Sequence, residues 1–366
     1  MNKRSEHSKR QEKKIIIVTG SMKRGGAERV ISIVSNYFAS LGWDVCIVSC
    51  LFPEVEYNLD SRIKILDISK QDRNQILDAP RLIVRLRKII KQEKPDAVFS
   101  FMMRINFITT SACKGLKIHF YPSERNDPSY GRSLFWRKAC EWAYGQSTHT
   151  IMQTKRARDY FSDKVRNKSI IIPNPVSVEE FASESKERVI VTVGRLERQK
   201  NQKMLIEAFS AIYKTHPDYK LRLFGRGSLE SELKGQVENL GLTDAVEFMG
   251  NVEDVHRQIR NASLFVMTSN FEGLSNSLIE AMMMGLPCIS TDCAGTDEII
   301  DDGESGIIIR CGDVSALTEA MSYLIENKDI ADKYGAEAHK RAKSRFNAET
   351  VCQKWKEIVD EPEIPF

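Results

Sequence analysis

The chain has 366 residues, of which 42% are hydrophobic and 28% are charged, and this length suggests two domains with cores of their own. Its net charge of +4 is unevenly divided, because residues 1–176 carry 32 Lys and Arg against 17 Asp and Glu, while the remainder carries 22 against 33. The sequence contains no run of about 18 apolar residues, which excludes a membrane-spanning helix.

The elements of the first half follow a strand–helix alternation. Residues 1–14 are expected to form a basic tail, without the apolar stretch of a secretion signal. An apolar strand at 15–20 leads through Gly25 and Gly26 into a helix with apolar residues at helical spacing. Further strand patterns occur at 43–50, 95–101, 117–123, 148–154 and 169–176. This alternation of strands and helices predicts a doubly wound parallel sheet over residues 15–172.

Residues 81–94 predict a basic amphipathic helix, with Arg81, Arg85, Arg87 and Lys88 beside an apolar stripe. Such a helix suits the surface of an anionic membrane, although more often the stripe simply packs on its own sheet. The polar loop at 121–132 offers Glu124, Arg125 and Asn126 as contacts for an acceptor or a sugar, with an ordinary turn as the alternative.

The second half repeats the alternation. Residues 173–187 are rich in Pro, Ser and charge and are predicted to be a linker. Strand patterns then recur at 188–194, 219–225, 245–250, 264–269, 287–291 and 306–310. We therefore expect an α/β protein with a second Rossmann-like domain at 188–345, a cleft between the domains, and a final helix and tail at 346–366.

Four strand ends of the second half carry residues suited to a ligand. Arg195 and Lys200 flank a turn into a helix and suit a diphosphate, although a solvated pair is the plainer interpretation. Glycines at the next two strand ends allow a close backbone approach, with Gly225 and Gly227 at one and Gly250 with Asn251 at the other.

The stretch FEGLSNSLIEAMMMG at 271–285 places one carboxylate before a helix and one inside it, Glu272 and Glu280. Between them, Gly273, Leu274, Ser275 and Asn276 offer backbone amides at a helix N-terminus, which is a site for an anion. A sugar nucleotide satisfies both features, because its phosphates accept from amides and its hydroxyls donate to carboxylates. The alternative is structural, with Glu272 as a cap and Glu280 paired to an arginine.

The motifs GRLERQKN, EGLSNSLIEAMMMGLPCIS and GGAERV resemble those of the GT-B retaining glycosyltransferases of family 4, over nearly the whole chain. This resemblance implies that Arg195 and Lys200 grip the donor diphosphate, Glu280 binds the ribose and Glu272 contacts sugar hydroxyls. It also implies that Gly25 and Gly26 line the cleft and that the final helix crosses back to the first domain. Many relatives carry a histidine near the sugar where this chain has Arg125.

The expected activity is transfer of a hexose or N-acetylhexosamine from a UDP-sugar to a polyprenyl-diphosphate-linked glycan, with retention. The alternatives are a GDP-sugar donor, a UDP-sugar 2-epimerase, a phosphorylase requiring pyridoxal phosphate, and a non-enzymatic basic binding protein. Eight scattered cysteines without a C-x-x-C pair predict reduced thiols and neither disulfides nor a metal site. We expect no bound cofactor, no nucleic-acid partner, and a cytoplasmic protein peripheral to the inner membrane face.

Overall fold

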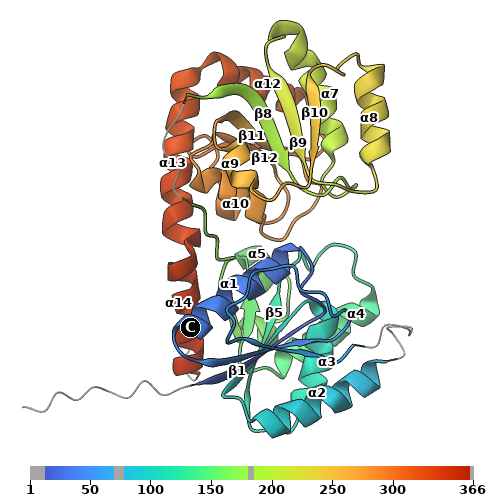
Figure 1. The fold of residues 1–366 in the computed structure, drawn as a ribbon, viewed down its shortest axis with the longest axis vertical. Coiled ribbons are helices and arrows are strands. Elements are labelled where there is room, and N and C mark those ends of the chain that lie inside the picture. The colour runs from blue at the N-terminus through green and yellow to red at the C-terminus, as the bar shows by residue number, and fades with distance from the viewer. Residues whose placement is uncertain (1–12, 70–77, 180–184, 363–366) are drawn as a thin grey trace, which may run out of the picture.

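The computed structural model describes residues 13–69, 78–179 and 185–362, and these form two halves stacked along the long axis (Figure 1). Each half contains one sheet in which every strand pair is parallel. The first sheet has the order β3-β2-β1-β4-β5-β6-β7 and the second β10-β9-β8-β11-β12-β13. The expected α/β architecture of two Rossmann-like halves is confirmed.

The first sheet comprises seven strands: β1 (Lys14–Thr19), β2 (Asp44–Ser49), β3 (Lys64–Asp67), β4 (Ala97–Phe101), β5 (His119–Glu124), β6 (Thr150–Met152) and β7 (Ser169–Ile171). Its helices are α1 (Gly26–Ser40), α2 (Ala79–Glu93), α3 (Met103–Cys113), α4 (Leu134–Gly145), α5 (Lys155–Asp159) and α6 (Asp163–Arg166). Alternate β1 residues face opposite layers, as a pleated strand requires. Ile15 and Ile17 pack with α1, whereas Ile16 and Val18 pack with α2 and α3.

The second sheet comprises β8 (Glu187–Val193), β9 (Lys220–Phe224), β10 (Val246–Gly250), β11 (Ala262–Met267), β12 (Cys288–Thr291) and β13 (Ile307–Ile309). Its helices are α7 (Gln202–Thr215), α8 (Glu230–Asn239), α9 (Val255–Ile259), α10 (Asn276–Met283), α11 (Thr296–Ile299), α12 (Val314–Glu326) and α13 (Lys328–Phe346). Apolar side chains from both faces of this sheet form two cores, one with α7 and α12 and one with α10 and α13.

The chain crosses between the halves at two adjacent places. The Val176 amide donates to the Phe346 carbonyl at 2.8 Å, and the Ala348 amide donates to the Val176 carbonyl at 3.0 Å. Beyond this point α14 (Ala348–Asp360) runs down the side of the first half (Figure 1). Its Trp355 is fully buried against Phe99 and Phe101. The expected return of the final helix to the first half is confirmed.

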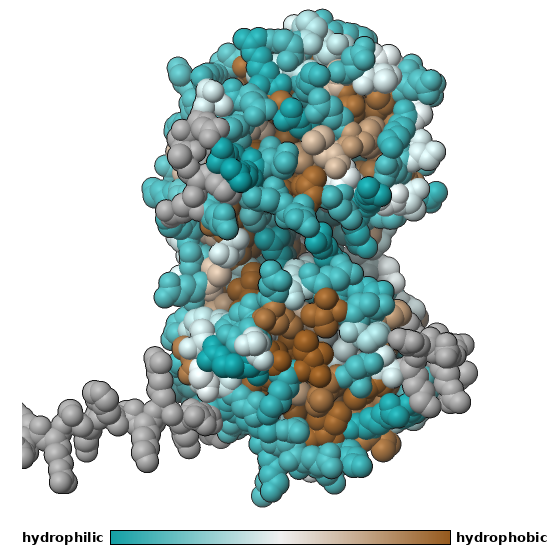
Figure 2. All heavy atoms as spheres, in the orientation of Figure 1, coloured by the Kyte–Doolittle hydropathy of each residue, from teal (hydrophilic) through white to brown (hydrophobic). Residues whose placement is uncertain are grey.

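Loops that follow the strands bring the two halves into contact. The side-chain amide of Asn276 donates to the Gly26 carbonyl at 3.4 Å, and Asn174 donates to the Leu274 carbonyl at 3.0 Å. The space-filling view narrows between the halves, and hydrophilic residues gather at this waist (Figure 2). Within the described ranges, no helix combines the length and apolarity needed to cross a bilayer.

Candidate active site between the two halves

Lys200 and Glu272 form the first part of the site. The Lys200 Nζ lies 2.5 Å from Glu272 Oε1, and both side chains are largely buried. Glu272 Oε1 also accepts a hydrogen bond from Ser269 Oγ at 2.8 Å. The Lys200 side chain folds over Gly194, at which a Cβ would lie 3.1 Å from Lys200 Cε. A cation and a carboxylate from separate loops are therefore held together where β8 ends.

Glu280 lies inside α10, with its side chain only 4% exposed, and it has two cationic or hydrogen-bonding partners. Arg29 Nη1, from the first turn of α1, lies 2.6 Å from Glu280 Oε1 across the cleft. His256 Nε2, from α9, hydrogen-bonds with Glu280 Oε2 at 2.9 Å. A buried carboxylate needs such partners, because burial without them costs several kcal/mol. The contact to Arg29 is the arginine pairing that the structural alternative expected for Glu280, and it places the carboxylate beside α1 of the first half.

The turn before α10 presents unoccupied amides. Ser275 caps the helix by accepting from the Leu278 amide at 3.5 Å. No described residue accepts a hydrogen bond from the amides of Asn276 and Ser277. Free amides at a helix N-terminus, aligned with the helix dipole, favour an anionic group. The geometry of this turn therefore suits a phosphate or another anion.

The same turn presses closely against the first half. A Cβ on Gly273 would lie 1.9 Å from the side-chain nitrogen of Gln153 and 2.7 Å from the Arg125 carbonyl oxygen, so only glycine fits there. Asn174 reinforces the contact, because its Nδ2 donates to the Leu274 carbonyl at 3.0 Å and to Asn276 Oδ1 at 2.7 Å.

Arg195 stands at the end of β8 with its guanidinium exposed. Its Nη2 lies 3.5 Å from Gln199 Oε1, which is a weak contact. Across the cleft, burial raises the pKa of the Glu28 carboxyl, whereas its own backbone amide and the positive charge of Arg195 partly oppose that rise. Arg195 therefore remains available to a ligand while it acts electrostatically on α1.

The glycines at the other strand ends allow neighbouring loops to pack closely against each other. A Cβ on Gly225 would lie 2.2 Å from the Gly194 carbonyl oxygen, and one on Gly227 would lie 2.2 Å from that of Leu196. The Gly225 amide donates to the Gly250 carbonyl at 2.8 Å, and Asn251 next to it is exposed. At Gly225 and Gly227 the direction in which a Cβ would point is thus filled by backbone of this chain.

Gly25 and Gly26 lie in the turn before α1. The Gly25 amide donates to the Tyr57 hydroxyl at 3.0 Å, and that hydroxyl donates to the Gly25 carbonyl at 2.7 Å. A Cβ on Gly26 would lie 3.7 Å from Asn276 Nδ2. Gly26 therefore borders the start of α10.

The acceptor or sugar corner requires a correction. Glu124 is buried, accepting from Arg132 Nη2 at 2.5 Å and from the Tyr144 hydroxyl at 2.8 Å. Arg125 is also buried, with its Cζ 5.2 Å from the centre of the Trp355 ring, and burial lowers its pKa to about 9. Arg125 Nη1 donates to Asn174 Oδ1 at 2.9 Å, so it supports the turn at 273–276 indirectly. Of the three residues only Asn126 is exposed.

The basic helix α2 also differs from the membrane interpretation. Its apolar stripe, Leu82, Leu86 and Ile90, packs into the core against the first sheet. Arg87 Nη1 donates to the Ala112 and Lys114 carbonyls at 2.8 and 2.7 Å, which ties it to the end of α3. Arg85 is exposed and donates to the Ile68 carbonyl at 3.3 Å, and Arg81 lies 3.9 Å from Asp78. Lys88 is exposed on the outer face. The stripe is therefore a core element and is not available to a bilayer.

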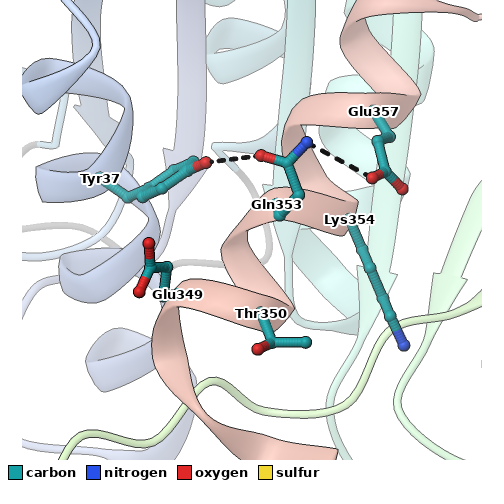
Figure 3. A pocket seen from close by; sticks show the side chains of 6 residues that line it. All are labelled: Tyr37, Glu349, Thr350, Gln353, Lys354 and Glu357. Carbon is teal, nitrogen blue, oxygen red and sulfur yellow. Dashed lines mark hydrogen bonds between the residues drawn. The ribbon is translucent and has the colours of Figure 1, made fainter.

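A shallow pocket of about 450 Å³ lies where α14 packs against α1. Figure 3 shows Tyr37 of α1 reaching toward Gln353 of α14, which in turn contacts Glu357. The remaining lining residues are Glu349, Thr350 and Lys354. None of these six is among the partners of Lys200, Glu272 or Glu280 described above, so this pocket is separate from the site between the halves.

Neither a metal-binding cluster nor a disulfide is present among the described residues. Within the described ranges, no three His, Cys, Asp or Glu side chains converge as a set that would hold a metal ion. All eight cysteines are free thiols, seven of them buried and Cys311 partly so. This agrees with the expectation of reduced thiols without disulfides.

Sequence reasoning missed several residues of the site, above all Arg29, His256, Asn174 and Gln153. Arg29 lies within the GGAERV motif, and its positive charge beside two glycines is a signal that could have identified it. His256 belongs to a five-residue helix with no distinctive pattern. Asn174 and Gln153 follow short strands of the first half, and only the folded structure brings them to the turn at 273–276.

Comparisons with known proteins match both halves. A family model described as Glycosyltransferase Family 4 matches residues 24–180, and one described as Glycosyl transferases group 1 matches residues 175–341. The two matches meet at the crossing between the halves.

Two relatives from Campylobacter jejuni are each 26% identical to the chain. One is named GalNAc-alpha-(1->4)-GalNAc-alpha-(1->3)-diNAcBac-PP-undecaprenol alpha-1,4-N-acetyl-D-galactosaminyltransferase, and the match covers 95% of this chain and 98% of that protein. The other is named N-acetylgalactosamine-N,N'-diacetylbacillosaminyl-diphospho-undecaprenol 4-alpha-N-acetylgalactosaminyltransferase, with 90% and 95% covered. Among solved structures, Anabaena HepE in complex with UDP superposes with a TM-score of 0.81 at 17% identity, over 95% of this chain and 100% of that one.

Proposed function

Since the chain belongs to the GT-B glycosyltransferases, with a family 4 domain followed by a group 1 domain, we propose that it transfers a hexose or N-acetylhexosamine from a UDP-sugar to a lipid-linked glycan. The sugar is of the galactose, N-acetylgalactosamine or N-acetylglucosamine type, and its anomeric configuration is retained. The acceptor is a saccharide on polyprenyl diphosphate, and the product enters surface polysaccharide or glycan synthesis.

One observation carries the donor assignment. Lys200 pairs with Glu272 at one end of the turn before α10, and buried Glu280 lies beyond the free amides at its other end. Cations and amides suit the diphosphate, and carboxylates suit the hydroxyls of the ribose and of the transferred sugar. In the structure Lys200 and Glu272 form an ion pair and neutralise one another. A donor diphosphate takes Glu272's place on Lys200 and frees that carboxylate for a sugar hydroxyl.

The chemistry follows from where charge develops. The bond from the anomeric carbon to the UDP oxygen breaks, and a bond to the acceptor oxygen forms on the same face of the sugar. Negative charge accumulates on the leaving phosphate, opposite Arg195, Lys200 and the amides at the start of α10, which stabilise it. The leaving phosphate accepts the proton of the acceptor hydroxyl. We assign the charge-neutralising role to these side chains, and we expect activity to persist after chelation of divalent ions.

The acceptor assignment is supported by the names of the two Campylobacter relatives, both of which act on undecaprenyl-diphosphate-linked saccharides. The UDP assignment is supported by the UDP complex of the Anabaena protein. A GDP-sugar donor is the competing assignment. The two are separated by measurement of nucleotide affinity.

Calorimetric titration of UDP, GDP and ADP into the wild type and Glu280→Ala tests the donor site. We expect UDP to bind most tightly and the substitution to weaken it by about tenfold or more, because a charged hydrogen bond to ribose is lost. Glu319→Ala, which removes an exposed carboxylate on α12, is the matched control. Tighter binding of GDP would replace the donor assignment, and no nucleotide binding would refute the transferase proposal as stated.

Incubation with UDP-N-acetylglucosamine alone separates transfer from epimerisation. A 2-epimerase converts this donor without any acceptor, whereas the proposed enzyme requires one. Retention is checked by the anomeric proton coupling of the product formed with a soluble acceptor. Product of inverted configuration would contradict that part of the proposal.

A further inference from the structure

An exposed apolar tip projects from the first half at the start of α4. Leu134 and Phe135, the first two residues of that helix, are 74% and 67% exposed, and Tyr130 in the preceding loop is 56% exposed. Single exposed apolar residues are ordinary on protein surfaces, but several gathered at one place mark a site of interaction. We call Tyr130, Leu134 and Phe135 the α4 tip.

The surroundings of the α4 tip are basic. Arg137 and Lys138 are exposed on the next turn of the helix, and no described carboxylate forms an ion pair with either. The Arg137 guanidinium lies over the ring of Tyr160, with its Cζ 5.6 Å from the ring centre. The nearby acids have other partners, since Glu141 accepts from Ser162 and Asp127 accepts from Ser129. Apolar side chains followed by exposed cations without ion-pair partners are the combination that binds an anionic lipid surface.

More positive charge extends from the tip across the same layer of helices. α3 packs against both α4 and α2, and the outer face of α2 exposes three cations, Arg85, Lys88 and Lys91. This layer lies on the opposite side of the first half from α14 (Figure 1). A second copy of the chain is a poor occupant for the tip, because a two-fold contact would bring the same cations face to face.

The α4 tip is also connected to the candidate active site. It follows β5, whose end faces the cleft, and the ring of Tyr130 stacks on that of Phe271 with centroids 3.6 Å apart. Phe271 directly precedes Glu272. The loop that carries the tip therefore touches the donor half one residue from the Lys200 partner.

We propose that the α4 tip inserts Leu134 and Phe135 into an anionic bilayer, with Arg137 and Lys138 bound to headgroup phosphates. This inference rests on the proposed function, because it places the mouth of the cleft at the surface where a lipid-linked acceptor presents its saccharide. It moves the membrane contact from the α2 stripe, which is buried, to the start of α4, while the outer α2 cations add long-range attraction. The stacking of Tyr130 on Phe271 holds the docked loop beside Glu272.

Co-sedimentation with vesicles tests the docking surface. We expect the protein to bind vesicles of phosphatidylglycerol and phosphatidylethanolamine, more weakly as salt rises, and Leu134→Ser/Phe135→Ser to lower the partition coefficient by about tenfold or more. Leu240→Ser removes a leucine that is 41% exposed on the second half and is the matched control. Val84→Ser, on the outer face of α2, checks the alternative surface. Trp136 lies beside Phe135, with ring centroids 5.3 Å apart, so its fluorescence should shift to shorter wavelength on docking.

Activity with two acceptors separates this inference from the proposed function. The tip variant should match the wild type with a short-chain, water-soluble acceptor analogue and fall with the same saccharide in vesicles. Equal vesicle binding by the wild type and the tip variant would overturn the inference, as would loss of binding only in Val84→Ser. Self-association that the tip variant abolishes, without vesicle binding, would assign the surface to a second copy. Failure of the wild type with the soluble acceptor, alongside normal docking, would instead count against the proposed function.

Discussion

Arg29 Nη1 contacts Glu280 Oε1 at 2.6 Å, and this ion pair joins the first turn of α1 to the middle of α10 across the cleft. The arginine side chain is 31% exposed, whereas the glutamate side chain is only 4% exposed. Loss of the pair therefore leaves Arg29 partly solvated by water but leaves Glu280 as a buried charge. Because Glu280 is the residue proposed to bind the ribose, this contact couples the orientation of its carboxylate to the relative position of the two halves.

A double-mutant cycle measures the coupling energy between Arg29 and Glu280. We expect Arg29→Met to lower the free energy of unfolding by about 2 kcal/mol, because it leaves a buried carboxylate with His256 as its remaining partner. In Arg29→Met/Glu280→Gln much of that loss should return, giving a coupling energy of about 1–2 kcal/mol by denaturant titration. Arg24→Met, which breaks an exposed pair with Glu56, is the control and should change stability by about 0.5 kcal/mol or less. Additive effects of the two substitutions would show that the pair is not coupled.

Lys200→Ala should reduce kcat by about 100- to 1000-fold, because it removes one group opposite the leaving phosphate. It should also lower the free energy of unfolding, because it leaves the largely buried Glu272 without its cation. Arg195→Ala is expected to act in the same direction. Arg198→Ala, an exposed cation in the same loop, serves as the control for general changes in charge. The measurement is steady-state kinetics with a soluble acceptor. Near-normal kcat in both variants would remove these residues from the mechanism.

The close fit of glycine loops predicts opposite outcomes for two glycine-to-alanine changes. Gly227→Ala should destabilise the protein by about 1–3 kcal/mol, because its Cβ would lie 2.2 Å from a backbone carbonyl oxygen. Gly235→Ala should stabilise it by about 0.5–1 kcal/mol, since this glycine lies within α8 and an added Cβ meets nothing within 4 Å. Thermal unfolding compares the two. A neutral Gly227→Ala would mean that the loops of β8 and β9 are free to separate.

The raised pKa of Glu28 predicts how the stability of the protein changes with pH. Its folded pKa lies above the ordinary value of 4.5, mainly because of burial, so the folded state binds more protons than the unfolded state and loses stability as pH rises above that value. Glu28→Gln should therefore raise Tm more at pH 8 than at pH 4.5. Glu54→Gln should show the opposite trend, because hydrogen bonding lowers the pKa of that exposed carboxyl. An equal effect of Glu28→Gln at both pH values would contradict the assigned shift.

Much of the fold was predictable from the sequence, because buried parallel strands are continuous apolar runs that end in glycine or polar residues. Strand β3 was not predicted, since Lys64–Asp67 is a short edge strand with mostly exposed side chains and no apolar run. Lys200, Glu272 and Glu280 were placed near one another by motif. The pairing of Lys200 with Glu272, and of Glu280 with Arg29, depends on contacts between distant loops.

Arg125 illustrates what local sequence does not contain. A cation in a polar loop after a strand reads as a surface residue, yet its guanidinium is stacked over Trp355, which comes from the far end of the chain. The α2 helix shows the reverse case, in which a basic amphipathic pattern was correct about the helix but did not reveal which surface its apolar stripe covers. Both outcomes are decided by tertiary packing.

The placement of α14 has a consequence for how the protein is made. The core of the first half includes Val351, Cys352, Trp355 and Ile358 from that helix. Lys13, immediately before β1, donates from its Nζ to the Val359 carbonyl at 3.0 Å. During synthesis the first half emerges from the ribosome long before these residues are translated, although domains generally fold in order of emergence. In the nascent chain Phe99, Phe101 and Tyr121 therefore remain uncovered by α14 until the whole donor half has been translated. A released chain truncated after residue 347, which still contains α13, should accordingly have a second half that resists protease and a first half that remains a target for chaperones.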